Sequence, residues 1–203
     1  MPTSDLTNLL ATARAELYSA VIGDICDEMG LRHQFLPPYL RPLQPAGSVP
    51  TLCGLAMPVL EADIFAEPAP GHPTDGRPFG RMLDAVDDLR HDEVYICAGA
   101  SHRYALVGEL MATAMKARGA TGVVTDGYVR DTTGLLELDF PVFSLGSYSQ
   151  DQRGRGLVVD FRVPIEIGGI RVEPGDILFG DVDGVLVVPQ TAAEEVFARS
   201  LEK

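Results

Sequence analysis

The chain has 203 residues, 46% of them hydrophobic, so it can bury one substantial core and we expect a single domain over residues 1–203. Its formal net charge of −13 argues against nucleic-acid and anionic-membrane partners, because both need a basic protein face. An anionic small substrate is not excluded, since a local arginine or a metal ion can override the overall field at one site.

The N-terminal residues and the cysteines favour a cytoplasmic protein. The first residues lack the basic start and apolar segment of a secretory signal, and no apolar run reaches the roughly 20 residues that span a bilayer. Cys26, Cys53 and Cys97 are an odd number, lie far apart and stand in apolar surroundings. These features indicate buried thiols in a reducing compartment.

Two helices are predicted at the start of the chain, over residues 4–16 and 18–29, and Gly30 ends the second. Asp24 and Asp27 lie three residues apart on that second helix. Such a pair could suggest a metal site, but the spacing is more typical of a solvated or capping face.

The next segment alternates between loops and buried elements. Residues 36–50 are proline-rich and predict a surface connection, whereas residues 51–62 are apolar enough for a buried strand. Prolines and glycines through residues 63–79 indicate a loop, with a mobile segment over an active site as the alternative. Residues 81–90 predict a helix.

A strand, a helix and a second strand follow. Residues 94–98 and 122–125 are short β-branched runs, and the residues from Glu109 onward favour a helix that Gly119 closes. This arrangement is a βαβ crossover, whose two strands run parallel. His102, in the loop before the helix, could contact a substrate, although a loop histidine is usually exposed or simply hydrogen-bonded.

The remainder of the chain changes to short strands. Residues 132–138 predict a helix or turn, and residues 141–145 predict a strand. Glycine- and proline-rich turns then separate strands of predicted β-hairpins, at residues 157–159, 163–167, 170–172 and 177–179.

The C-terminal segment is predicted to contain a turn, a strand and a helix. Residues 181–184 begin like a calcium loop but lack its later carboxylates, so we expect a turn, followed by a buried strand at residues 185–188. Thr191 and Glu194 predict a capping box for a helix that runs through Leu201.

The crossover predicts where polar groups gather. Because both strands end at one edge of the sheet, Glu109 at the helix start is expected close to Arg130 and Asp131. Carboxylates are hard ligands for Mg²⁺ or Mn²⁺, a guanidinium suits a carboxylate or an enolate oxygen, and free helix-terminal amides at Leu110 and Met111 suit a substrate carboxylate. The alternative is that the Arg-Asp pair only caps the next helix, with Glu109 a favourable charge at a helix start.

Other catalytic chemistries find little support. The sequence has no phosphate-binding loop, dinucleotide fingerprint, zinc motif or nucleophile elbow. Its two lysines, Lys116 within the predicted helix and Lys203 at the end, are poorly placed for Schiff-base chemistry, which needs a desolvated lysine. Chemistry that passes through an enolate would therefore need a metal ion in place of a Schiff base.

The segments 107–110 and 119–131 resemble the RraA-like family. That family includes class II 4-hydroxy-4-methyl-2-oxoglutarate aldolases and protein regulators of ribonuclease activity. The aldolases share an acidic residue, twenty intervening positions and an Arg-Asp pair, and Glu109 followed by Arg130-Asp131 has that spacing. Glu109 stands where the best-described aldolases have Asp. The resemblance extends from about Tyr18 to the C-terminus.

The resemblance implies an α/β fold of the swivelling-domain type, an αββα sandwich with a parallel βαβ core and C-terminal antiparallel hairpins. It implies a homotrimer or a hexamer of trimers, with the site at a subunit interface. The implied activity is metal-dependent cleavage of a 4-hydroxy-2-oxo acid to release pyruvate, with oxaloacetate decarboxylation beside it. The alternative that the family offers is a non-catalytic regulator that binds a ribonuclease or another protein.

The resemblance also implies residue roles. Asp131 would bind Mg²⁺ or Mn²⁺, and Glu109 would act through a metal-bound water. Arg130 would bind substrate and stabilise the enolate. Gly108 and the amides of Leu110 and Met111 would complete the substrate site.

Overall fold

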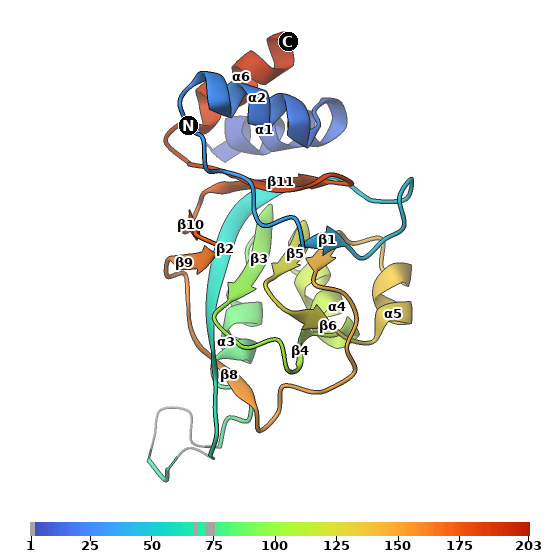
Figure 1. The fold of residues 1–203 in the computed structure, drawn as a ribbon, viewed down its shortest axis with the longest axis vertical. Coiled ribbons are helices and arrows are strands. Elements are labelled where there is room, and N and C mark those ends of the chain that lie inside the picture. The colour runs from blue at the N-terminus through green and yellow to red at the C-terminus, as the bar shows by residue number, and fades with distance from the viewer. Residues whose placement is uncertain (1–2, 67–68, 72–75) are drawn as a thin grey trace.

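The computed structural model describes residues 3–66, 69–71 and 76–203, so part of the predicted 63–79 loop lies outside the described residues (Figure 1). The helices are α1 (Thr3–Glu16), α2 (Ser19–Glu28), α3 (Met82–Asp87), α4 (Glu109–Ala117), α5 (Thr132–Glu137) and α6 (Ala193–Glu202). The strands are β1 (Arg41–Pro42), β2 (Leu52–Asp63), β3 (Glu93–Ala98), β4 (Ala105–Val107), β5 (Gly122–Thr125), β6 (Tyr128–Val129), β7 (Val142–Ser144), β8 (Gly156–Phe161), β9 (Ile165–Ile167), β10 (Ile170–Val172), β11 (Ile177–Asp181) and β12 (Gly184–Val188).

One large sheet has the strand order β1-β7-β5-β3-β2-β11-β12, with β8 paired to β2. Its centre is parallel, because β2 with β3, β3 with β5, and β5 with β7 all run in the same direction. The pairs β2–β11 and β11–β12 are antiparallel, and β9–β10 forms a separate antiparallel hairpin. The predicted parallel βαβ core is therefore confirmed, and the predicted antiparallel hairpins form at β9–β10 and β11–β12.

Alternation of side chains along the strands builds the layers of the αββα sandwich. On β3, Tyr95 and Cys97 face the core beneath α3 and α4, whereas Val94 and Ile96 face the opposite core. Leu178 of β11 joins that second core, which therefore lies between two layers of strands.

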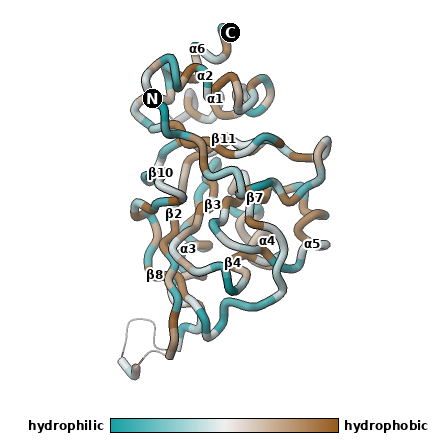
Figure 2. The backbone as a smooth tube through the Cα atoms, viewed as in Figure 1, coloured by the Kyte–Doolittle hydropathy of each residue, from teal (hydrophilic) through white to brown (hydrophobic). Residues whose placement is uncertain are grey.

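The other face of β11 and β12 packs against the remaining helices. Ile177 and Phe179 share a third core with residues of α1, α2 and α6, and these helices form a layer beside β11 (Figure 1). In Figure 2 hydrophobic segments concentrate in the central strands and hydrophilic ones in the connecting loops. Among the described residues, no helix is both long enough and apolar enough to cross a membrane.

Several local predictions hold. The two N-terminal helices, the long strand β2 and the helix within the crossover lie where they are expected. Cys26, Cys53 and Cys97 are buried and unpaired. Asp181 and Gly184 pair across the turn between β11 and β12, so this segment is a hairpin turn.

Two local predictions are wrong. Two of the predicted hairpins do not form. The strand at residues 156–161 pairs antiparallel with β2, far away in the chain, and not with the strand that follows it; β11 likewise pairs with β2 and β12 and not with β10. The capping box at Thr191 does not form, because α6 begins at Ala193 with Ala192 as its N-cap residue and no side-chain cap hydrogen bond. Thr191 thus stands one residue before the position from which a side chain could cap.

Candidate active site at the start of helix α4

A two-stranded parallel ribbon, which the sequence analysis did not predict, sets the geometry of the site. The chain does not pass from β3 directly into α4; it first forms β4, which pairs with β6 through Ala105–Tyr128 and Val107–Val129. The amide of Arg130 then donates to the carbonyl oxygen of Val107 over 2.9 Å. Because both strands end there, the start of α4 and the Arg130-Asp131 pair emerge side by side.

Gly108 permits this close approach. It is the N-cap residue of α4 in an extended conformation, and a Cβ atom placed there would lie 2.6 Å from Oδ2 of Asp131 and 3.3 Å from the Arg130 side chain. A larger residue at this position would force the carboxylate away. The first backbone bond of the helix runs from Ala112 to Gly108, which leaves the earlier amides of the first turn free of intrahelical partners.

Asp131 faces the start of α4. It adopts a left-handed conformation (φ 58°, ψ 40°) as the N-cap residue of α5, yet its side chain makes no capping hydrogen bond to that helix. Instead its Oδ2 accepts a 3.4 Å hydrogen bond from the amide of Glu109. The side chain of Asp131 is therefore directed to the other helix and does not serve as a cap.

Arg130 lies between two carboxylates. Its Nε is 3.8 Å from Oδ2 of Asp131, and its Nη1 is 3.5 Å from Oδ1 of Asp151. All three side chains are partly exposed, so each can still exchange a protein partner for a ligand. Asp151 was not identified from the sequence, because it stands in an irregular segment with no motif around it.

Glu109 differs from the prediction in detail. Its backbone amide contacts Asp131, but its carboxyl group lies over α5, where a Cβ atom at Gly134 would be 2.4 Å from Oε2 of Glu109. The structure therefore places Glu109 beside the Arg-Asp pair through the main chain, with its side chain against the neighbouring helix.

A cavity of about 280 Å³ opens at this point. Its polar end is formed by Arg130, Asp131, Asp151 and Gln152, and Leu110 and Met111 also line it. The rest of the wall comes from α3, α4, β4 and the segment before α3 and is apolar: Phe79, Met82, Leu83, Val86, Ala105, Leu106, Val107 and Ala114, together with Gly108. The predicted substrate-site residues Gly108, Leu110 and Met111 thus share one cavity with the Arg-Asp pair.

His102 does not line this cavity. Its Nε2 lies 3.5 Å from Oδ1 of Asp126, and its ring meets that of Tyr128 edge to face. Tyr39 also approaches Asp126, and burial together with that carboxylate raises the pKa of the Tyr39 hydroxyl. His102 is therefore an exposed side chain that packs beside the ribbon and takes no part in the cavity wall.

The carboxylates at the cavity could supply only some of the ligands that a hard cation needs. Within the described ranges, no cluster of three or more His, Cys, Asp or Glu side chains could hold a metal ion. Mg²⁺, however, usually keeps several waters and takes one or two carboxylates together with substrate oxygens. Asp131, whose Oδ2 meets one amide at the long distance of 3.4 Å, fits such a sparse site.

Comparison with known proteins identifies the family of the chain. The sequence profile of the RraA-like family, described as Aldolase/RraA, matches residues 20–187. The chain belongs to the RraA-like family.

One curated relative matches about half of the chain. A protein of Halalkalibacterium halodurans named putative 4-hydroxy-4-methyl-2-oxoglutarate aldolase is 33% identical over 112 residues, which are 55% of this chain and 53% of that protein. The chain spans about half the length of this curated relative.

Two solved structures share the fold. A chain described under novel cellulases from microbes associated with the gut ecosystem has a TM-score of 0.86 and 31% identity, and the match covers 100% of this chain and 86% of that one. Streptomyces coelicolor RraAS2, described as an unusual member of the RNase ES inhibitor RraA protein family, has a TM-score of 0.79 and 21% identity, covering 96% and 91%.

Proposed function

We propose that this protein is a divalent-metal-dependent lyase that cleaves a 4-hydroxy-2-oxo mono- or dicarboxylic acid and releases pyruvate, with oxaloacetate decarboxylation as an accompanying activity. The observation that carries the proposal is the meeting of Arg130, Asp131 and the free amides of α4 at the polar end of one cavity. Membership of a family that contains aldolases supports it, as does the name of the Halalkalibacterium relative.

In this proposal Asp131 would bind Mg²⁺ or Mn²⁺ directly, and the carboxylate of Glu109 would contact the ion through a bound water molecule. When bound, such an ion supplies Lewis-acid polarisation of the 2-oxo group of the substrate. The guanidinium of Arg130 stabilises the enolate oxygen that develops as the C3–C4 bond breaks, because it carries a fixed positive charge and is already held beside the cavity.

The amides at the start of α4 would bind the substrate carboxylate. Leu110 and Met111 line the cavity and belong to the first helical turn, whose N–H groups lack intrahelical acceptors. Gly108 leaves the space in which the Asp131 carboxylate lies against the start of this helix. The same pyruvate enolate arises when oxaloacetate loses carbon dioxide, so one site serves both reactions.

A second copy of the chain would complete the site in a homotrimer or a hexamer. Leu83 and Leu110, on the cavity wall, are 66% and 84% exposed, and large apolar side chains at such exposure suit burial against a partner. We expect no nucleic-acid or membrane partner, in keeping with the charge of −13, and a cytoplasmic location.

A lactate-dehydrogenase-coupled assay of pyruvate release tests the proposal. We expect turnover of a 4-hydroxy-2-oxo acid and of oxaloacetate that a chelator abolishes and Mg²⁺ restores. Asp131→Ala and Arg130→Ala should each abolish turnover without changing the oligomer, whereas Asp183→Asn, at an exposed turn between β11 and β12, should match wild type. Chelator-resistant or unchanged turnover in the two site variants would contradict the proposal.

A non-catalytic regulator is the rival function. It predicts that the purified protein binds a ribonuclease yet releases no pyruvate with or without metal. The same assay, combined with a pull-down of the ribonuclease, therefore separates the two functions.

A further inference from the structure

A buried carboxyl group lies directly behind the cavity. Glu61 stands on β2 and is only 2% exposed, and its Oε2 accepts a hydrogen bond from Nε2 of Gln152. Gln152 is also 2% exposed and forms part of the cavity wall next to Asp151, the partner of Arg130. One hydrogen bond thus links an interior carboxyl group to the polar end of the candidate site.

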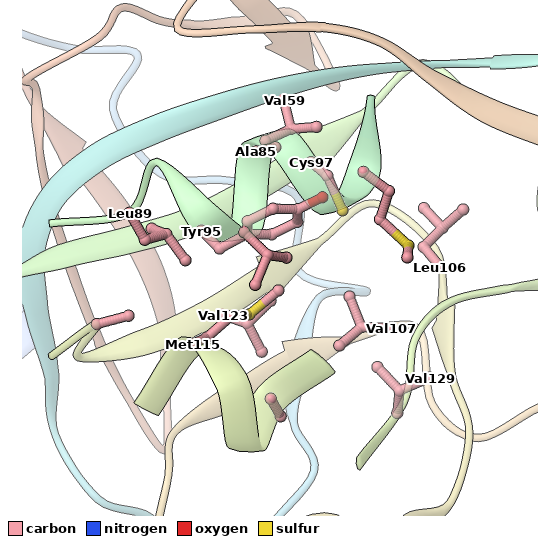
Figure 3. Close-up of a cluster of buried hydrophobic side chains, with 14 of the residues drawn as sticks. Val59, Ala85, Leu89, Tyr95, Cys97, Leu106, Val107, Met115, Val123 and Val129 are labelled. Atoms are coloured by element: carbon pink, nitrogen blue, oxygen red, sulfur yellow. The ribbon is translucent and has the colours of Figure 1, made fainter. Parts of the chain in front are cut away.

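Within the described part of the chain, no cation is among the groups that shift the pKa of Glu61. The titratable groups that face it are Tyr95 and Cys97 from β3 and Tyr104 from the segment before β4. Figure 3 shows the hydroxyl of Tyr95 beside the sulfur of Cys97 in this core. Among the described residues, Oε1 of Glu61 and the hydroxyl of Tyr95 have no hydrogen-bond partner.

Burial raises the pKa of the Glu61 carboxyl to about 8, and the contacts with Gln152 and Cys97 offset only part of this effect. Burial also raises the pKa values of Tyr95, Cys97 and Tyr104 above their usual range. Glu61 therefore ionises before the other three groups, and at neutral pH it is a neutral carboxylic acid.

The hydrogen bond to Glu61 fixes the orientation of the side-chain amide of Gln152. Because Nε2 of Gln152 donates inward to Oε2 of Glu61, the amide oxygen of Gln152 is the group left for other contacts. Among the described residues, no donor satisfies that oxygen. The glutamine therefore offers a neutral acceptor at a cavity wall where Asp131 and Asp151 offer carboxylate acceptors and Arg130 and the amides of α4 offer donors.

We propose that Glu61 is a positioning residue, which holds Gln152 so that its amide oxygen accepts a hydrogen bond from the hydroxyl group of a hydroxy-acid substrate. This inference rests on the proposed lyase function and specifies one substrate contact within it. The hydrogen bond from Gln152 favours the ionised form of Glu61, so the glutamine keeps its orientation in either protonation state of the carboxyl group.

The test is a double-mutant cycle with rescue by a conservative variant, using the coupled pyruvate assay. Glu61→Leu and Gln152→Leu should each lower kcat/KM about 10-fold, and the double variant should lose no more than either single one, because both remove the same contact. Glu61→Gln keeps an acceptor and should stay within about threefold of wild type near neutral pH.

Gln44→Leu is the matched control. Gln44 is another buried glutamine, whose Nε2 donates to the carbonyl oxygen of Phe140 away from the cavity, so its loss should lower stability while leaving kcat/KM unchanged. Independent, additive effects of the Glu61 and Gln152 variants would overturn the inference. If Glu61→Leu does not fold, a kcat/KM of Gln152→Leu equal to wild type has the same consequence. A wild-type protein without any pyruvate release overturns the proposed function itself, and this inference with it.

Discussion

The amide of Glu109 donates to Oδ2 of Asp131 over 3.4 Å, which joins the beginning of one helix to the residue that precedes the next. The contact exists because β4 and β6 pair in parallel and both end at this point. It places a carboxylate in the positive field of a helix N-terminus, where the dipole and the free amides favour negative charge.

Gly108→Ala should weaken catalysis strongly. The new Cβ atom would lie 2.6 Å from Oδ2 of Asp131, so the carboxylate must move or the ribbon must open. We expect kcat/KM to fall about 10- to 100-fold, as is common for misplaced catalytic groups. Overpacking of this kind should lower the free energy of unfolding by about 1–3 kcal/mol. The coupled assay and urea unfolding measure both effects, and a fully active variant would show that the contact has no role.

Glu109→Ala and Gly134→Ala should act alike. The first removes the Glu109 carboxyl group, and the second displaces it, because a Cβ atom at Gly134 would lie 2.4 Å from Oε2. If this carboxylate acts through a metal-bound water, both changes should raise the Mg²⁺ concentration needed for half-maximal activity. Titration of the metal-free protein with Mg²⁺ measures this, and a response of Glu109→Ala equal to wild type would contradict the role.

Glu61 should make the protein less stable as pH rises. Its carboxyl has a pKa of about 8 in the folded protein but about 4.5 when unfolded, so between these values only the unfolded state has released the proton. The free energy of unfolding should therefore decrease from about pH 4.5 to about 8 and level off above. Thermal unfolding across this window should be flatter for Glu61→Gln; the same slope in both proteins would show that Glu61 is ionised in the core.

Asp63 should make the protein less stable as pH falls. Burial pushes its pKa upward, but hydrogen bonds from Tyr104, Ser101 and Arg103 outweigh burial and hold the pKa at about 2. Stability should be lost as pH falls from about 3.8 to about 2, because the unfolded state takes up the proton first.

The loss attributable to Asp63 should be about 1–2 kcal/mol after allowance for its partial exposure. Acid unfolding of wild type and Asp63→Asn measures it. The variant should begin less stable and lose less on acidification, and identical acid transitions would exclude this contribution.

The sequence by itself determined the family, the parallel crossover and the Arg130-Asp131 pair. These follow from signals that are local, namely a good helix former ended by Gly119 between two β-branched runs and a fixed spacing from Glu109. Local signals also located most helices and strands, because burial of one face imposes a period of two or 3.6 residues on the chain.

Only the tertiary structure decided how the site is assembled. β4 and β6 are three and two residues long, too short for any periodicity, and their pairing is what brings Gly108 against Asp131. Asp151 and Gln152 reach the cavity from an irregular segment, and Gln152 meets Glu61 across 91 positions of sequence. Contacts of this kind cannot be predicted from local composition. They depend on the register of paired strands and on which polar side chains become buried when the core packs.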